Sequence, residues 1–232
     1  AGYVMADNPQ AWVGTTINTA NGTYHLDVSA GLWLLSYAVD PNSGYIALDH
    51  HKVVPVQSGQ TAGVPLPVAA KDSLIAGQVL DPDGNPLPGA VVLAFGSHGL
   101  INQVTVAGHT DSQGHFAIRA PHGAYDLIAG HADPHWLNPV LASVIAPPNA
   151  ATTNVVLQFR EPDVVLSGHV SLAPEFNGDD GVVHIWAYSE DGAATFATAQ
   201  LGEPYALGLV SGVRWHIGAV VEFGNTFYAF RE

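Results

Sequence analysis

The sequence repeats itself with a period of roughly ninety residues, and this repeat constrains the fold more than any other feature. In each copy a Gly precedes an aromatic residue, and a second Gly–aromatic pair follows. The middle copy carries Gly114, Phe116, Gly123 and Tyr125, and the first copy carries Gly22, Tyr24, Gly31 and Trp33 at the same spacing. The third copy carries Gly202, Tyr205, Gly212 and Trp215, with each aromatic one residue later, so we expect a bulge or insertion there. The repeat predicts three domains, at residues 1–72, 73–162 and 163–232.

Each copy is filled by short segments in which apolar and polar residues alternate, as in residues 115–119. The 25 Gly and 16 Pro interrupt the chain too often for long amphipathic helices. A Gly at a corner permits positive φ, and the aromatic residue that follows it fills the space between two sheets. We therefore predict an all-β fold of tandem, Ig-like antiparallel β-sandwiches, about three in number.

The middle copy resembles the carboxypeptidase regulatory-like domain, a seven-stranded sandwich of the transthyretin-like group. The resemblance lies in the stretches GQVLDPDGNPLPGAVVLAF, TDSQGHFAI and PHGAYDLIAGH. It is weaker for the first copy and distant for the third. It implies a non-catalytic accessory or structural module of a secreted or surface protein. The related Cna B-type modules contain a Lys–Asn isopeptide bond, which we do not expect here, because only the middle copy has an opening Lys, Lys71.

The outer copies are each one strand short. The first copy begins at a point that matches Gly89 of the middle copy, so it lacks the opening strand equivalent to residues 74–80. Only 17 residues follow Trp215, whereas 34 separate Tyr125 from Phe159, so the third copy lacks its closing strand. An absent strand leaves backbone groups unpaired, each costing about 1 to 3 kcal/mol when buried. Two explanations stay open: the chain is a piece of a longer array, or neighbouring copies donate strands to a head-to-tail homopolymer.

The charge of the chain excludes some partners. Six Lys plus Arg against twenty Asp plus Glu give a formal charge of −14, the wrong sign for nucleic acid or an anionic lipid surface. No apolar run has the length of a membrane span, so we expect no membrane insertion. The chain has no Cys, which excludes disulfides and thiolate metal sites. The surface, poor in Lys and rich in small polar residues, favours an extracellular or cell-surface location.

The candidate metal ligands are His131, Asp133 and His135, which stand close together in one loop. The equivalent loop of the first copy, AVDPN, has no His, so we favour surface histidines and expect no metal or cofactor. Residues 81–85 begin like a Ca²⁺-binding loop, but no Glu follows at the twelfth position of such a loop. We therefore interpret them as an ordinary turn. No HExxH, GxSxG or P-loop motif occurs, and we therefore expect no enzyme.

Trp186 and Tyr188 are candidate glycan-binding residues. Val183, Ile185 and Ala187 alternate with His184, Trp186 and Tyr188, so the two sets lie on opposite faces of one strand. The second set forms either a ligand platform or a subunit contact. Asn21 begins the only Asn-x-Thr sequon, at a predicted hairpin tip, and is a candidate glycosylation site of a glycoprotein.

These observations predict a non-catalytic structural subunit of an extracellular filament or surface appendage. Its partners would be copies of itself, joined head to tail by strand complementation. The alternative is a carbohydrate-binding accessory region of a secreted hydrolase or adhesin, which rests on Trp12, Trp136, Trp186 and Tyr188.

Overall fold

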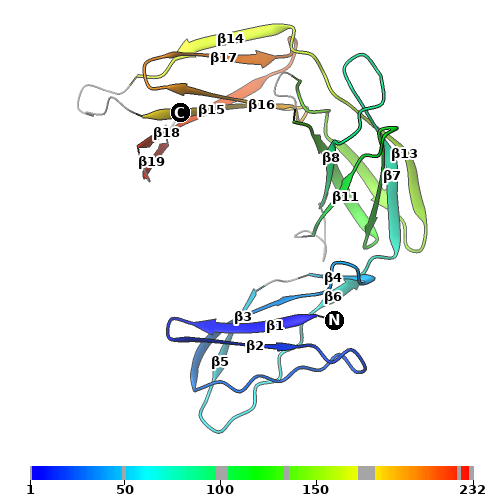
Figure 1. Ribbon diagram of the computed structural model, residues 1–232, viewed down its shortest axis with the longest axis vertical. Helices are drawn as coiled ribbons and strands as arrows, with labels where there is room; N and C mark the ends of the chain where they lie inside the picture. The colour runs from blue at the N-terminus through cyan, green and yellow to red at the C-terminus, as the bar shows by residue number, and fades with distance from the viewer. Residues whose placement is uncertain are drawn as a thin grey trace.

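The computed structural model describes residues 2–48, 51–97, 104–132, 136–171 and 181–223, together with the backbone of a strand at residues 226–229. Its regular elements within these ranges are all strands, β1 to β19, and most of them pair antiparallel. The all-β, Ig-like sandwich fold predicted from the repeat is therefore confirmed. Nowhere in the described ranges does a helix with the length and apolar character of a membrane span occur. Figure 1 shows three units that follow one another along an open curve.

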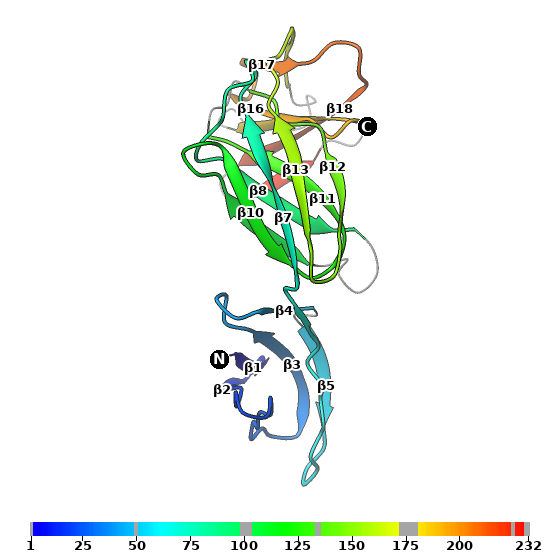
Figure 2. The ribbon, with the colours of Figure 1, turned by 90° about the vertical axis from the view of Figure 1, so that its right-hand side faces the viewer.

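The middle unit is a complete seven-stranded sandwich. One sheet has the order β10 (His115–Ala120), β7 (Ser73–Leu80), β13 (Ala151–Gln158), and the other has the order β12 (Ala142–Ala146), β11 (Gly123–Gly130), β8 (Val91–Gly96), β9 (Thr105–His109). The opening strand β7 lies between β10, which is antiparallel to it, and β13, which is parallel to it (Figure 2). Its alternate residues Ile75 and Val79 are fully buried in a core cluster that extends to Phe159.

The first unit repeats the four-stranded sheet but not the three-stranded one. Its larger sheet has the order β2 (Ala11–Thr16), β1 (Tyr3–Asn8), β3 (Gly31–Ala38), β5 (His51–Val56). A short pair, β4 (Tyr45–Ala47) and β6 (Val68–Ala70), lies beside it. Residues 23–29 and 60–67 are extended without forming strands, and they are the counterparts of β10 and β13 in the sequence repeat.

The third unit also repeats the four-stranded sheet, in the order β16 (Ala194–Gln200), β15 (Val182–Ser189), β18 (Trp215–Phe223), β19 (Thr226–Ala229). Its second sheet consists of β14 (Val164–His169) and β17 (Pro204–Leu209). These two strands correspond to β7 and β10, and the described residues include no counterpart of β13. Three separate core clusters accompany the three units. The domain boundaries after residues 72 and 162 remain predictions.

The repeated aromatic residue donates a hydrogen bond to a carbonyl group a few residues earlier in each unit. The Trp33 indole donates to the carbonyl of Ser29, four residues earlier, and the Tyr125 hydroxyl donates to that of Pro121, also four residues earlier. Burial, with a smaller contribution from the charge of Asp72, raises the pKa of Tyr125 to about 12. In the third unit the Trp215 indole reaches back five residues to Val210 instead. The pairing of β14 with β17 has no bulge. The extra residue before each aromatic of this copy therefore lies in the turns at residues 201–203 and 211–213.

Specific contacts join successive units. At the end of the first unit, the backbone N–H of Lys71 donates to the carbonyl of Gly44, and its Nζ donates to the carbonyl of Pro41 at 2.9 Å, so these bonds hold the segment that leads into the middle unit. Ile46 and Leu48, from the first unit, pack against the core of the middle unit. At the second joint, Arg160 lies 2.7 Å from the carboxylate of Asp191.

Candidate functional site

An open groove occupies the place in the first unit where a strand equivalent to β7 would lie. In the middle unit β7 fills the space between β10 and β13. In the first unit the counterparts of those neighbours, residues 23–29 and 60–67, flank a cavity of about 890 Å³, which we call the open groove. Both flanks line it, and no described strand lies between them.

The lining of the open groove is apolar. Its floor is formed by core residues of β3, chiefly Trp33, Leu35 and Tyr37. One flank contributes Tyr24, Leu26 and Val28, and the other contributes Val64 and Leu66; all five are only partly buried. In the middle unit the corresponding flank residues Phe116, Ile118, Ala120 and Leu157 are buried almost completely. The hydrophobic core of the first unit is therefore only partly covered on the side of the open groove.

The backbone along both flanks is available for pairing. Among the described residues, the N–H groups of residues 24–28 and of residues 61–64 have no backbone acceptor. By contrast, β10 pairs with β7 over six residues, and β13 pairs with β7 over six more. An added β-strand can use N–H groups without acceptors on both sides of an apolar trough, since main-chain hydrogen bonds supply affinity and side-chain pockets supply specificity.

One side chain bridges the open groove. The hydroxyl of Tyr24 donates a hydrogen bond to the carbonyl oxygen of Val64 at 2.7 Å, so it links the two flanks. Burial raises the pKa of Tyr24 above its ordinary value, so the hydroxyl remains a donor to a higher pH than in an exposed tyrosine. The flanks are thus held at a separation that one tyrosine can span.

The third unit also has a strand edge that pairs with no described residue. Its opening strand β14 pairs with β17 on one edge, and the described residues pair nothing with its other edge. In the middle unit that edge of β7 is covered by β13. The consequence is visible in burial, because Val165 of β14 is 69% exposed, whereas β7 has no exposed residue.

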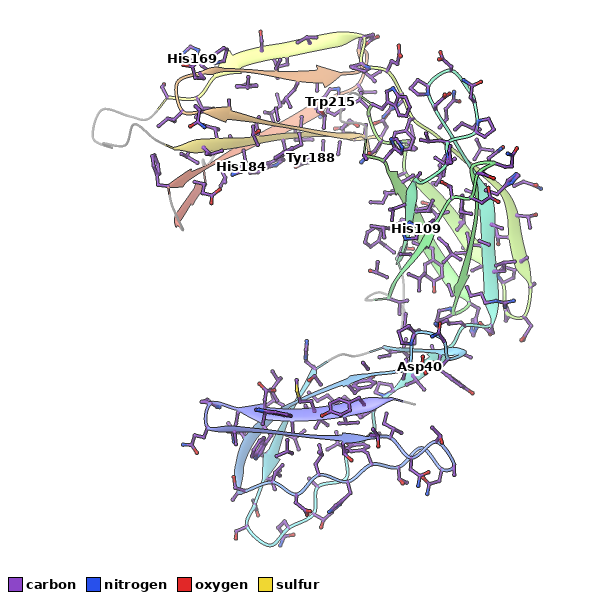
Figure 3. All side chains as sticks on the ribbon, viewed as in Figure 1. Asp40, His109, His169, His184, Tyr188 and Trp215 are labelled. Carbon is purple, nitrogen blue, oxygen red and sulfur yellow. The ribbon has the colours of Figure 1, made fainter. Side chains whose placement is uncertain are left out.

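A second feature is an exposed aromatic face on the third unit. Val183, Ile185 and Ala187 are buried, as predicted, and the alternate side chains of β15 point to the opposite face. Figure 3 shows His184 and Tyr188 along β15, and Tyr188 stacks on His216 with ring centroids 5.0 Å apart. We call this face, formed by His184, Trp186, Tyr188, Phe196 and His216, the aromatic face.

Trp186 lies at the centre of the aromatic face, paired with Phe196 on one side and Gly218 on the other. A Cβ atom at Gly218 would lie 2.5 Å from the indole, so the ring covers this glycine. Trp186 is 38% exposed, Tyr188 52% and Phe196 62%. His184 stacks on Phe196 and lies 2.9 Å from the carboxylate of Glu222. The face combines flat apolar rings with hydrogen-bonding groups.

The described residues bring none of the other sequence candidates together at a common site. Asp133 and His135 lie outside the described residues, and His131 stacks on Trp136, whose ring packs against the middle core. No group of three or more potential metal ligands occurs among the described residues. Asp81 closes its own turn by accepting the N–H of Asn85 at 2.7 Å. Asn21 is exposed and accepts hydrogen bonds from Thr23.

Sequence reasoning predicted that each outer unit lacks a strand but did not identify the groove-lining residues 60–67. Their signal is present in the alternation Val64, Pro65, Leu66, Pro67, Val68, in which every second residue is apolar and non-proline. The prolines remove two N–H groups, which conceals the strand-like character of the segment. Phe196 and His216 were also missed, because only cross-strand pairing brings them beside Trp186 and Tyr188.

No protein-family model matches the sequence, and no curated protein is similar to it. Among solved structures, the TIE protein of Bacillus anthracis is similar over 99% of this chain, with 17% identity and a TM-score of 0.31, and the chain spans 44% of its length. A DUF3823 family protein from Bacteroides ovatus is similar over 69% of this chain and 96% of its own, with 13% identity and a TM-score of 0.30. A streptococcal ancillary pilin is similar over 88% of this chain and 72% of its own, with 11% identity and a TM-score of 0.30.

Proposed function

We propose that the chain is a non-catalytic structural subunit of an extracellular filament or surface appendage, whose copies join head to tail by strand complementation. The observation that carries this proposal is the open groove, an apolar trough flanked on both sides by N–H groups that have no backbone acceptor among the described residues. The edge of β14 that pairs with no described strand is a second place where a strand from a neighbour can add.

The occupant of the open groove is a strand supplied by a neighbouring subunit. A donated strand would bury the flank residues Leu26 and Leu66 and would supply partners to the N–H groups of both flanks. Joining of the same two ends in every subunit is heterologous, so it extends into a filament unless the rotation closes a ring. The chain therefore acts as a rigid link whose outer units become complete in the assembly.

Light scattering and negative-stain electron microscopy of the full chain over a range of concentrations test this proposal. We expect concentration-dependent oligomers and regular fibres. Leu26→Asp, which places a charge in the open groove, should abolish them, whereas Val53→Asp, at a 67% exposed position outside the groove, should not. A folded chain that stays monomeric at every concentration would overturn the proposal, and thermal unfolding of Leu26→Asp checks that the variant still folds.

A second candidate function is glycan binding at the aromatic face. The observation that favours it is the exposure of Trp186 and Tyr188 beside the His184–Glu222 pair, since sugar sites combine flat rings with polar groups. Glycan-array binding lost in Trp186→Ala would support it. Phe95→Ala is the matched control, because Phe95 is 37% exposed but lies in β8 of the middle unit. Binding that survives Trp186→Ala, or that is absent from the intact chain, counts against this function.

A further inference from the structure

The two filled counterparts of the open groove indicate which strand the groove accepts. In the middle unit Gly77 of β7 is directly opposite Phe116. In the third unit Gly168 of β14 is directly opposite Tyr205. Phe116, Tyr205 and Tyr24 occupy the same position of the sequence repeat. The strand that enters the open groove would therefore place one residue opposite Tyr24.

That residue has no room for a side chain. In the middle unit a Cβ atom at Gly77 would lie 2.0 Å from the carbonyl oxygen of Val155 and 2.9 Å from the Phe116 ring. In the third unit, where no described strand covers the other edge of β14, a Cβ atom at Gly168 would still lie 3.0 Å from the Tyr205 hydroxyl. The repeat makes Val64 the counterpart of Val155, and the Tyr24 hydroxyl already bonds to the Val64 carbonyl. The residue that passes between Tyr24 and Val64 must therefore be glycine.

The positions on either side of the glycine must be apolar. Two residues before Gly77, Ile75 pairs with Ile118 and is fully buried, and two residues after it, Val79 is fully buried. β14 has the same pattern, with Leu166 and Val170 packed against the core of the third unit. In the first unit Leu26 is the counterpart of Ile118, and its flank is open to receive such a side chain.

We propose that the open groove selects an extended polypeptide segment of a partner chain with the pattern apolar-x-Gly-x-apolar. The segment lies antiparallel to residues 23–28 and parallel to residues 60–67, with its glycine opposite Tyr24. This inference rests on the proposed strand complementation and deepens it, because it fixes the sequence, direction and register of the donor. Selection at the glycine comes from backbone and ring contacts, so it excludes every larger residue.

Two peptides taken from this chain serve as probes, residues 72–81 and residues 163–171, each labelled with a fluorophore. Added to the intact chain, both should bind saturably by fluorescence anisotropy. Gly77→Val in the first peptide should weaken binding at least tenfold, whereas Gln78→Val, at an outward-facing position, should leave the affinity within about twofold. Hydrogen exchange should show new protection of residues 24–28 and 61–64. Equal affinity of the Gly77→Val peptide would overturn the proposal.

Disulfide trapping tests the register, because the chain contains no Cys. Ala76 pairs with Ala117, the counterpart of His25. A His25→Cys chain should therefore cross-link to a peptide carrying Ala76→Cys and not to peptides carrying Leu74→Cys or Gln78→Cys. Cross-linking to all three peptides alike would overturn the register.

The outcomes separate this inference from the proposed function. If the chain forms fibres but neither peptide binds or competes with assembly, the donor pattern is wrong and strand complementation stands on the effect of Leu26→Asp. If peptides bind in the expected register but the chain stays monomeric, the donor pattern holds and the homopolymer is wrong. If neither assembly nor binding occurs, both are wrong.

Discussion

The hydroxyl of Tyr24 donates a hydrogen bond to the carbonyl oxygen of Val64, 2.7 Å away, across a space that no described strand occupies. In the middle unit the counterparts of these residues, Phe116 and Val155, enclose Gly77 of β7 between them. The same chain thus contains a filled and an open version of one site. This relationship connects the sequence repeat to the proposed function, because the filled version shows what the open one lacks.

The glycine at the centre of the filled site should be intolerant of a side chain. Gly77→Ala places a Cβ atom against the Val155 carbonyl, so β7 or β13 must shift, and we expect the free energy of unfolding of the middle unit to fall by about 1 to 3 kcal/mol or more. Gly130→Ala is the control, because nothing lies within 4 Å of its added Cβ atom. Urea denaturation of the three proteins measures the difference. Equal midpoints for the two variants would contradict the enclosed site.

Thr110 should stabilise the middle unit through its hydroxyl. Thr110 Oγ1 accepts the N–H of Ala90 at 2.9 Å and donates to the carbonyl of Leu87 at 2.8 Å, and the residue is buried. Thr110→Val leaves both backbone groups without this partner, at a cost of about 1 to 3 kcal/mol. Thr105→Val, at an exposed position of β9, should change stability by less than about 0.5 kcal/mol. Similar losses from both substitutions would argue against this role.

The fold was largely predictable because its signals are local and repeated. Gly22, Gly114 and Gly202 all have positive φ, and Trp33 and Tyr125 both lie in the cores, as the spacing predicted. The prediction that each outer unit lacks a strand also came from the repeat, because the middle copy shows how long each copy should be. The middle copy thus served as the standard against which the other two copies were compared.

The site itself was less predictable, because it depends on non-local contacts. Nothing in the local sequence indicates that Tyr24 reaches Val64, forty residues away, or that Gly77 must pass between two neighbouring strands. Only the part of the aromatic face that lies on β15 was predicted, since period-two alternation places Trp186 and Tyr188 on the same side of the strand. Phe196 and His216 join them only through strand pairing, whose register the sequence does not specify.

Association of the chain should strengthen as the pH falls from 8 to 5.5. Protonation of all twelve His would change the formal charge from −14 to −2, and unperturbed His titrates near about 6.5. Like-charge repulsion between subunits then decreases. Light scattering at the two pH values measures this, and added salt at pH 8 should have a similar effect because it screens the same repulsion. Association that is unchanged by both treatments would show that like-charge repulsion does not limit it.

The joint between the middle and third units should weaken in acid through one carboxylate. The Arg160 guanidinium, above all, and then the hydrogen bonds from Ser189 and Ala193 lower the pKa of Asp191 from 3.8 to about 2, against the opposing effect of burial. Because the pKa is lower in the folded state, this stabilisation is fully present above about pH 5 and is lost as the pH falls from about 4 to 2. Its size is at most about 2 kcal/mol.

Asp191→Asn should remove this pH dependence and leave the partly buried Arg160 without its carboxylate, so the third unit should unfold more readily at pH 7. Glu190→Gln is the matched control, because Glu190 pairs with Arg214 at a largely exposed site where an ion pair contributes about 0 to 1 kcal/mol. Thermal unfolding at pH 7, 4 and 2.5 measures both variants. We expect Asp191→Asn to approach the unmodified chain in stability at pH 2.5, because the unmodified carboxylate is then losing its charge. A constant difference at all three pH values would show that the Arg160–Asp191 pair acts through shape and not through charge.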